Sequence, residues 1–230
     1  MSMKADDNQL PFADVIGASV NDMRNSLGQV LYKLTGISEE LDTQESKLGL
    51  QVVEYEVTRM QNVMNQLHGL YLIETDSLTI QMQEVYVFEL IDDILAGMNG
   101  LLANKKVEVE LRGEDICWYL DPYLMTNVLN IAILNAVRYT NDKICITLVH
   151  SEKGLSISID DNGQGYPDVV LERFNNVKAG MSIEEVSSQN IGWLFCEKIA
   201  SLHKNQGNAG ETILDNESVI SGGRLQVLLP

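Results

Sequence analysis

Two long runs of apolar residues recur at alternating intervals of four and three residues, and this spacing constrains the fold of the first third of the chain. Such a pattern places one apolar stripe along each of two α-helices. The segment TGISEELDTQES between the runs carries Gly36 and capping-type residues, so we interpret it as the connection of an antiparallel hairpin. The first stripe comprises Ile16, Val20, Met23, Leu27, Val30 and Leu34, and the second comprises Val53, Val57, Met60, Met64, Leu67 and Tyr71.

A hairpin with a single stripe on each helix has a thin core. Hairpins of this kind commonly complete their core by pairing as homodimers into a four-helix bundle. The alternative is that both stripes pack against the remainder of the same chain. The length and regularity of the stripes favour the homodimer, so we expect a dimerisation hairpin over residues 11–82, after an N-terminal tail of residues 1–10.

Beyond residue 82 the pattern changes to helices mixed with alternating, strand-like segments. This order predicts an α+β sandwich of helices on an antiparallel sheet over residues 83–230. The helical segments are VYVFELIDDILAGMNGLLANK, DPYLMTNVLNIAILNAVRYTN and SSQNIGWLFCEKIASLHKN. The strand-like segments are VEVELRG, ICWYL, SGGRLQVLLP and the hairpin KICITLVHSEKGLSISIDDNGQGYP.

The composition narrows the possible partners. A formal net charge of -17 repels nucleic acid and anionic membrane surfaces, which leaves proteins and small anions held by local charge. The three cysteines are scattered without a CxxC pair, so neither a disulfide framework nor a zinc site is indicated. No apolar run reaches the roughly 18 to 20 residues that span a bilayer, and the first residues lack a signal-peptide core. We expect a cytoplasmic protein without membrane insertion.

Four motifs follow the hairpin in a recognisable order: LNAVRYT, DDNGQGYP, IGWLFCEKIASLH and GGRLQVLLP. Together they resemble the catalytic core of sensor histidine kinases, from about Phe12 to Pro230. That core is a dimerisation hairpin followed by an ATPase domain of the GHKL type, an α/β sandwich shared with gyrase. The resemblance implies that the chain binds ATP or ADP with Mg²⁺ and that its partner is the receiver domain of a response regulator.

The resemblance assigns roles to two residues of the LNAVRYT motif. Asn135 corresponds to the magnesium-binding asparagine of the family, and an amide oxygen suits a hard cation that also binds a triphosphate. Arg138, one turn later on the same helix face, is placed to meet a phosphate. The alternatives are a helix-surface asparagine and a solvated arginine.

The DDNGQG motif corresponds to the adenine site of the family. There the carboxylate of Asp161 would accept a hydrogen bond from the adenine amino group, while Gly163 and Gly165 allow a tight turn beside the base. The alternative is a polar turn after a strand, which any such sequence could form. Gly192 matches one glycine of the second glycine motif, at a helix start where backbone amides could face phosphate.

The chain also departs from the family pattern around the phosphates. Ile131 stands where the family usually has a second asparagine, and the glycine-rich GxGLGL is reduced to QNIGWL. The lid over ATP, expected at residues 174–190, is short. Fewer glycines leave fewer backbone amides that can approach a phosphate. We therefore expect weak nucleotide binding, with ADP bound as well as ATP.

The first helix departs further, because Asn21 stands where the family has its phosphate-accepting histidine. An amide has no nucleophilic nitrogen of suitable basicity. Asp22 and Asn25, three residues apart on one helix face, resemble the pair with which such hairpins dephosphorylate response regulators. We expect a phosphatase or modulator without autokinase activity. The alternatives are a non-catalytic scaffold that sequesters a response regulator or pairs with an active kinase, and an autokinase whose histidine was replaced at Asn21.

Overall fold

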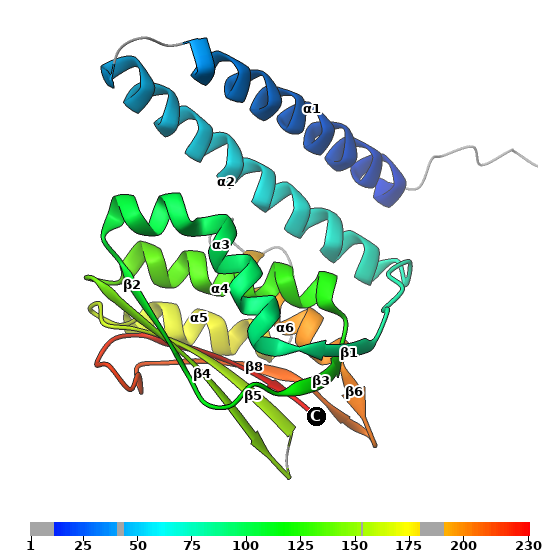
Figure 1. Ribbon diagram of the computed structural model, residues 1–230. Helices are drawn as coiled ribbons and strands as arrows, with labels where there is room; N and C mark the ends of the chain where they lie inside the picture. The colour runs from blue at the N-terminus through cyan, green and yellow to red at the C-terminus, as the bar shows by residue number, and fades with distance from the viewer. Residues whose placement is uncertain (1–11, 41–43, 153, 180–190) are drawn as a thin grey trace, which may run out of the picture. The chain divides into compact units, whose positions relative to one another are not determined.

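The computed structural model describes residues 12–40, 44–152, 154–179 and 191–230 (Figure 1). The chain divides into two compact units, Met1–Leu78 and Thr79–Pro230. The division lies a few residues before the boundary expected near residue 82. Within the described residues, no helix is both long and apolar enough to cross a bilayer.

The N-terminal unit is a hairpin of two long helices, α1 (Phe12–Glu40) and α2 (Gln44–Glu74). The connection is shorter than expected, because helix continues through Gly36 and only residues 41–43 between the two helices lie outside the described part. The helices approach closely at Gly17, where an added Cβ would lie 2.6 Å from the ring of Tyr71. The absence of a side chain at Gly17 therefore lets a tyrosine ring rest on the backbone of the opposite helix.

The apolar stripes are only partly covered within this hairpin. Val20 is 8% exposed, but Met23 is 55% exposed and Val30 is 42% exposed. On α2, Val53 and Met60 are 47% and 51% exposed. Each helix therefore buries one edge of its stripe against the other helix and leaves a second edge, at seven-residue spacing, open in the single chain.

The C-terminal unit is built on a mixed five-stranded sheet in the order β2-β4-β5-β9-β8. The prediction of a purely antiparallel sheet is wrong at one pair, because β2 runs parallel to β4. The chain between them is long enough for the crossover that a parallel pair requires. The strands of this sheet are β2 (Glu108–Arg112), β4 (Lys143–Ser151), β5 (Gly154–Asp161), β8 (Glu211–Asp215) and β9 (Arg224–Leu229).

Two short ladders stand apart from this sheet. The strand expected at ICWYL pairs antiparallel with a strand that the sequence did not reveal, and a second ladder joins two two-residue strands. The strands of these ladders are β1 (Gln83–Tyr86), β3 (Cys117–Leu120), β6 (Lys204–Asn205) and β7 (Asn208–Ala209).

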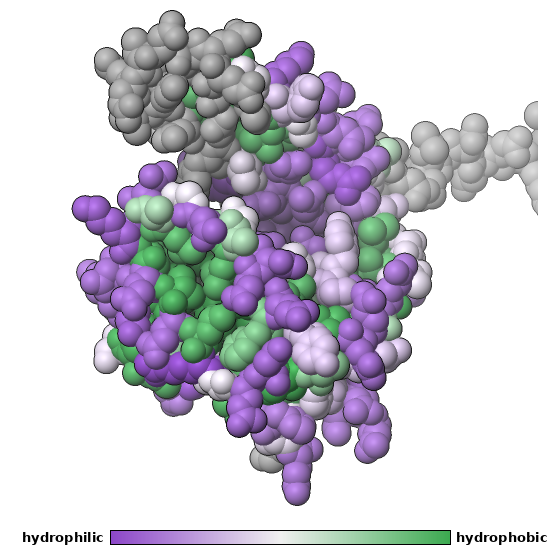
Figure 2. Space-filling view, in the orientation of Figure 1, coloured by the Kyte–Doolittle hydropathy of each residue, from purple (hydrophilic) through white to green (hydrophobic). Residues whose placement is uncertain are grey.

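On the face of the C-terminal unit shown in Figure 2, hydrophilic residues surround a smaller apolar area.

Helices cover one face of the main sheet (Figure 1). Along β5, Leu155, Ile157 and Ile159 are buried and alternate with less buried residues, as expected of a sheet with one covered face. The helices present matching apolar stripes, which on the first of them fall at intervals of three or four residues. They are α3 (Val87–Lys105), α4 (Pro122–Tyr139), α5 (Asp168–Lys178) and α6 (Ile191–Leu202).

Buried polar contacts fix α4 against the end of α6. Asp121 caps α4, accepting a hydrogen bond from the Leu124 N–H at 3.0 Å. The Asp121 N–H donates to Nε2 of His203 at 3.1 Å, and Nδ1 of His203 lies 2.9 Å from the Ile199 carbonyl oxygen. Burial lowers the pKa of His203. A neutral ring that accepts at Nε2 and donates at Nδ1 satisfies both contacts.

Asn162 ties the turn after β5 to the turn between α4 and β4. Its Oδ1 accepts from the Thr140 hydroxyl at 2.7 Å and from the backbone N–H groups of Asn141, Asp142 and Lys143 at 3.1 to 3.2 Å. Its Nδ2 donates to the Asp142 carboxylate at 2.7 Å. One side chain thus fixes the loop that begins the DNGQG turn.

We predict that Asn162→Asp destabilises the C-terminal unit by about 1–3 kcal/mol, because the change removes a donor and sets a second carboxylate beside Asp142. Urea denaturation followed by circular dichroism measures the loss. Asn99→Asp, the same change at an exposed position of α3, is the matched control and should stay within about 0.5 kcal/mol of the parent. Equal losses in both variants would contradict this role of Asn162.

Candidate nucleotide site and hairpin face

Asp161 ends β5 with its side chain almost completely buried, at 3% exposed. Its Oδ1 accepts the Gly163 N–H at 2.7 Å. Its backbone N–H donates to the Gly223 carbonyl at 2.9 Å, and its carbonyl accepts from the Ser218 hydroxyl at 2.9 Å. Its Oδ2 accepts no hydrogen bond from the described residues, so one carboxylate oxygen remains for a donor such as the adenine amino group.

Glycines let the backbone close around this carboxylate. A Cβ on Gly163 would collide with the Tyr139 carbonyl oxygen, and Gly165 has a φ of +76°, which favours glycine. Gly222 and Gly223 were not singled out in the sequence. A Cβ on Gly223 would lie 2.6 Å from the Tyr166 ring and 3.0 Å from Oδ2 of Asp161. The sequence feature that could have indicated these two residues is the pair of adjacent glycines in SGGRLQVLLP.

The two glycine motifs meet through aromatic side chains that sequence reasoning also missed. Tyr166 directly follows Gly165, Trp193 directly follows Gly192, and their ring centroids lie 6.4 Å apart at nearly right angles. The ring of Phe174 packs edge-on against the indole of Trp193, with ring centroids 6.3 Å apart. Burial, together with the charge of Asp161, raises the pKa of Tyr166, so its phenol is neutral beside the carboxylate.

Of the residues expected near the phosphates, Asn135 and Arg138 lie on α4, and Gly192 is the second residue of α6. Asn135 is half-buried one turn before Tyr139, the residue whose carbonyl touches the Gly163 turn. Arg138 is exposed, with its guanidinium carbon 5.6 Å from the centroid of the Tyr139 ring. That contact gives Arg138 a partner within the fold. Ile131, another turn earlier, is half-buried.

The region expected as a lid divides into two parts. Phe174 lies in α5 and is 1% exposed, so its side chain belongs to the core. Residues 180–190 of the expected lid lie outside the described part. Phe174 is part of the core and not of a lid because its ring packs against Trp193 of α6.

A magnesium ion would be held chiefly through the nucleotide. Among the described residues no group of three or more His, Cys, Asp or Glu side chains could bind a metal. The amide oxygen of Asn135 fits the preference of Mg²⁺ for oxygen ligands, with phosphates and water as the remaining ligands. The amide of Asn135 therefore fits a Mg²⁺ that a nucleotide would bring with it.

On the hairpin, Asp22 and Asn25 are both exposed on α1, as expected. Asn21, beside them on the same helix, is partly exposed. The Arg24 guanidinium donates to Oδ1 of Asn21 at 2.6 Å. Residues three apart lie on neighbouring positions of one helix face, which explains the pair.

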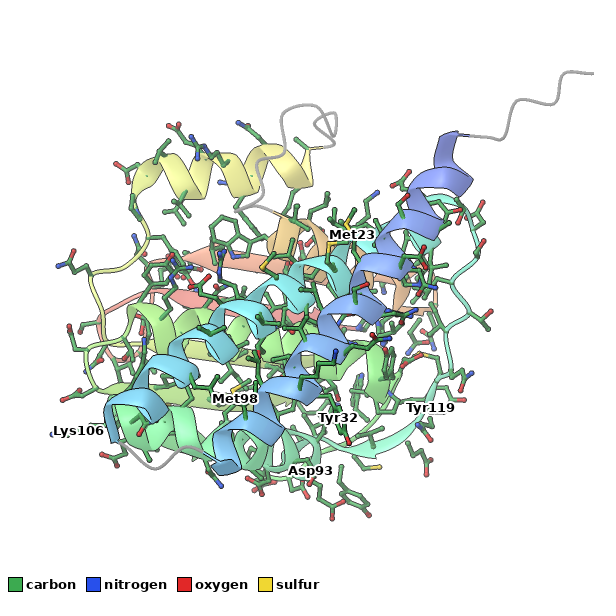
Figure 3. The ribbon with its side chains drawn as sticks, turned by 90° about the horizontal axis from the view of Figure 1, so that it is seen from above. Met23, Tyr32, Asp93, Met98, Lys106 and Tyr119 are labelled. Carbon is green, nitrogen blue, oxygen red and sulfur yellow. The ribbon has the colours of Figure 1, made fainter. Side chains whose placement is uncertain are left out.

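An open hollow runs along α1 beside these residues. Asn25 is part of its lining, together with two cations and a tyrosine that is 83% exposed. Figure 3 labels this tyrosine, Tyr32, and Met23 on the same helix. The hollow presents positive charge on a chain that is strongly acidic overall. Its lining residues are Arg24, Asn25, Gly28, Gln29, Tyr32, Lys33 and Gln61.

Residues 120–226 match the family described as histidine kinase-, DNA gyrase B- and HSP90-like ATPase. The sensor-type histidine kinase PrrB of Mycobacterium tuberculosis is 35% identical over 104 residues, which are 43% of this chain and 21% of that protein. The chain thus spans about a fifth of the curated relatives it matches.

Solved structures share the fold. Acinetobacter baumannii histidine kinase AdeS aligns with a TM-score of 0.59 at 18% identity, over 89% of this chain and 95% of that one. Full-length ShkA in complex with AMPPNP aligns with a TM-score of 0.67 at 13% identity, over 95% of this chain and 46% of that one. The ATP-binding domain of M. tuberculosis PrrB gives 0.51 at 24% identity, over 65% and 97%. The chain therefore has the fold of histidine kinase catalytic cores, and its residues 120–226 match the histidine kinase-, DNA gyrase B- and HSP90-like ATPase family.

Proposed function

We propose that this chain binds the receiver domain of a response regulator and dephosphorylates it, without autokinase activity. The observation that carries the proposal is the exposed pair Asp22 and Asn25 on α1, next to Asn21 in the position of the phosphate-accepting histidine. The comparisons support two-component signalling in general. The direction of phosphate transfer, from the receiver to water, rests on these three side chains. The three free cysteines agree with a reducing cytoplasm, where receivers act.

The hairpin lacks a phosphate acceptor at this position. The amide nitrogen of Asn21 is not a nucleophile at neutral pH. Its oxygen is engaged by the Arg24 guanidinium at 2.6 Å, which holds the side chain along the helix surface. Autokinase activity would require a histidine here, so it remains only if Asn21 replaces a histidine of the natural protein.

Dephosphorylation needs little from the hairpin. Water attacks the phosphorus of the aspartyl phosphate, the aspartate oxygen leaves, and inorganic phosphate is released. The receiver supplies its own Mg²⁺, so the hairpin contributes mainly position. The amide of Asn25 can orient the water in line with the breaking bond. The carboxylate of Asp22 can hold a lysine of the receiver.

The hollow beside Asn25 suits an acidic partner. Arg24 and Lys33 contribute positive charge to its lining, and Tyr32 contributes an exposed aromatic ring. A phosphorylated receiver presents a negative phosphoryl group, and complementary charge speeds association and sets orientation. Docking on this hollow would bring the aspartyl phosphate next to Asn25.

A non-catalytic scaffold is the second candidate. It would use the same hollow to hold a receiver, with Asn25 as a surface residue. The hollow alone favours neither function, because binding and catalysis share the surface. The two differ in the effect of Asn25, which is dispensable for holding a partner and required for orienting water.

We also propose that the hairpin forms a homodimer. Met23, Val30, Val53 and Met60 are exposed in the single chain and repeat at seven-residue spacing on their helices. Pairing two hairpins would bury these side chains, and each fully buried apolar side chain contributes about 1.5–3 kcal/mol. The resulting four-helix bundle would carry Asp22 and Asn25 on its outer face.

The ATPase domain is proposed as the regulatory part. The free Oδ2 of Asp161 and the tight glycine turn support binding of the adenine end of ATP or ADP, with Mg²⁺ at Asn135. Ile131 and the reduced second glycine motif support weak binding on the phosphate side. A nucleotide held mainly by its base would bind as ADP about as well as ATP.

For the dimer, we predict that Met23→Lys with Met60→Lys gives a monomer, because pairing would bury four unpaired charges. Light scattering after size-exclusion chromatography reports the mass. Thr58→Lys adds a charge at an exposed position of α2 two residues from Met60, and this control should remain dimeric. A parent protein of monomer mass would overturn the dimer.

For the nucleotide, we predict that Asp161→Asn weakens ADP binding about 10- to 100-fold. The change keeps the shape and presents an NH₂ group or a neutral oxygen to the adenine amino group in place of a charged acceptor. Isothermal titration calorimetry measures the affinity. Glu152→Gln, in the turn between β4 and β5, removes the same charge and should leave ADP affinity unchanged. Absence of binding to the parent at millimolar ADP would refute the nucleotide site.

For the phosphatase, we predict that Asn25→Ala lowers the acceleration of dephosphorylation about 100-fold and leaves receiver affinity nearly unchanged, because the amide acts on water in the transition state. Asp22→Ala should weaken both. Ser26→Ala, an exposed neighbour, is the control. The assay follows phosphate release from a receiver phosphorylated with acetyl phosphate. A bound receiver that loses phosphate at its unassisted rate would favour the scaffold.

A further inference from the structure

Trp193 carries a buried hydrogen-bond donor without an acceptor. Its Nε1 is excluded from solvent and has no hydrogen-bond partner within the described part of the chain. An unpaired buried donor costs about 1–3 kcal/mol, and most such groups in folded proteins are paired. This donor is unsatisfied within the fold, so an acceptor brought by a ligand would remove that cost.

The surroundings of Trp193 connect it to the base end of the nucleotide site. Its ring packs edge-on against Tyr166. Tyr166 in turn lies against Gly223, where an added Cβ would be 2.6 Å from the tyrosine ring and 3.0 Å from Oδ2 of Asp161. The indole, the phenol ring and the carboxylate are thus successive neighbours in the fold.

We propose that Trp193 is a nucleotide-binding residue, whose indole lies along the purine nucleotide and whose N–H donates to an acceptor of that ligand. The proposal rests on the nucleotide binding proposed above and adds a specific residue to it. A purine offers a large flat face for an aromatic wall, and its ring nitrogens and ribose oxygens are acceptors. Asp161 takes the amino group, so the two residues would recognise opposite hydrogen-bonding characters of one ligand.

The position of Trp193 in the chain makes this contact sensitive to the second glycine motif. The residue is the third of α6, directly after Gly192. Phe174 supports it from α5, with ring centroids 6.3 Å apart, so the indole is held between two rings. A ring packed in this way loses little conformational freedom when the ligand binds.

Fluorescence can report on Trp193 alone, because the chain has only two tryptophans. The other, Trp118, packs on His150 with ring centroids 5.1 Å apart, in β3. In the Trp118→Phe protein, addition of ADP should change the emission of Trp193 and saturate with the calorimetric affinity. The Trp118→Phe change should leave ADP affinity at the parent value. Emission that stays constant while ADP binds would overturn the inference.

Calorimetry of two further variants of the full chain separates the ring from its donor. Trp193→Phe keeps an aromatic ring and removes the N–H, so ADP should bind about 3- to 10-fold more weakly. In Trp193→Leu, ADP affinity should fall by a further factor of about 3 to 10, because the aromatic face is also removed. Equal ADP affinity in the parent and Trp193→Phe overturns the role of Trp193 and leaves the proposed nucleotide site standing. No binding of ADP to the parent overturns both.

Discussion

The backbone packing around the Asp161 carboxylate is the constraint on which the C-terminal unit depends. Asp161 is bonded through its N–H, its carbonyl and its Oδ1 to Gly223, Ser218 and Gly163. These partners come from the loop before β9 and from the turn after β5. A side chain at Gly163 or Gly223 would collide with the atoms that enclose the carboxylate. The carboxylate can therefore be enclosed in this way only where two distant segments carry glycine. Its Oδ2 remains available to a hydrogen-bond donor.

The residues on either side of Asp161 fix two further loops through hydrogen bonds of their side chains. Asp160, buried on the opposite side of the strand, accepts the Val219 N–H at 3.0 Å and so fixes the loop between β8 and β9. Burial raises the pKa of Asp160, because desolvation disfavours the charged carboxylate. Asn162 fixes the turn between α4 and β4. Three consecutive residues thus fix three loops around the end of β5.

Periodicity predicted the long helices and the β4–β5 hairpin, because each buries a regular face. It did not predict α5, β1 or β8. The strand β1 has only four residues, three of them exposed, so its sequence carries no alternation. The parallel pairing of β2 with β4 depends on the path of the chain between them. Asp161 was found through its motif, but Gly223 and Trp193 act through residues distant in sequence, and local patterns do not encode such contacts.

Under the proposed function, the departures from the family pattern in the two units agree with each other. A kinase must deliver a γ-phosphate to a histidine, so both the phosphate end of the pocket and the acceptor are needed together. Once Asn21 stands in place of the acceptor, the phosphate end is free to change, and Ile131 and the reduced glycine motif lie at that end. A receiver phosphatase needs only the exposed pair on α1. The nucleotide can then act through binding alone, and binding alone requires a base site, which is the end where Asp161, Tyr166 and Trp193 are gathered.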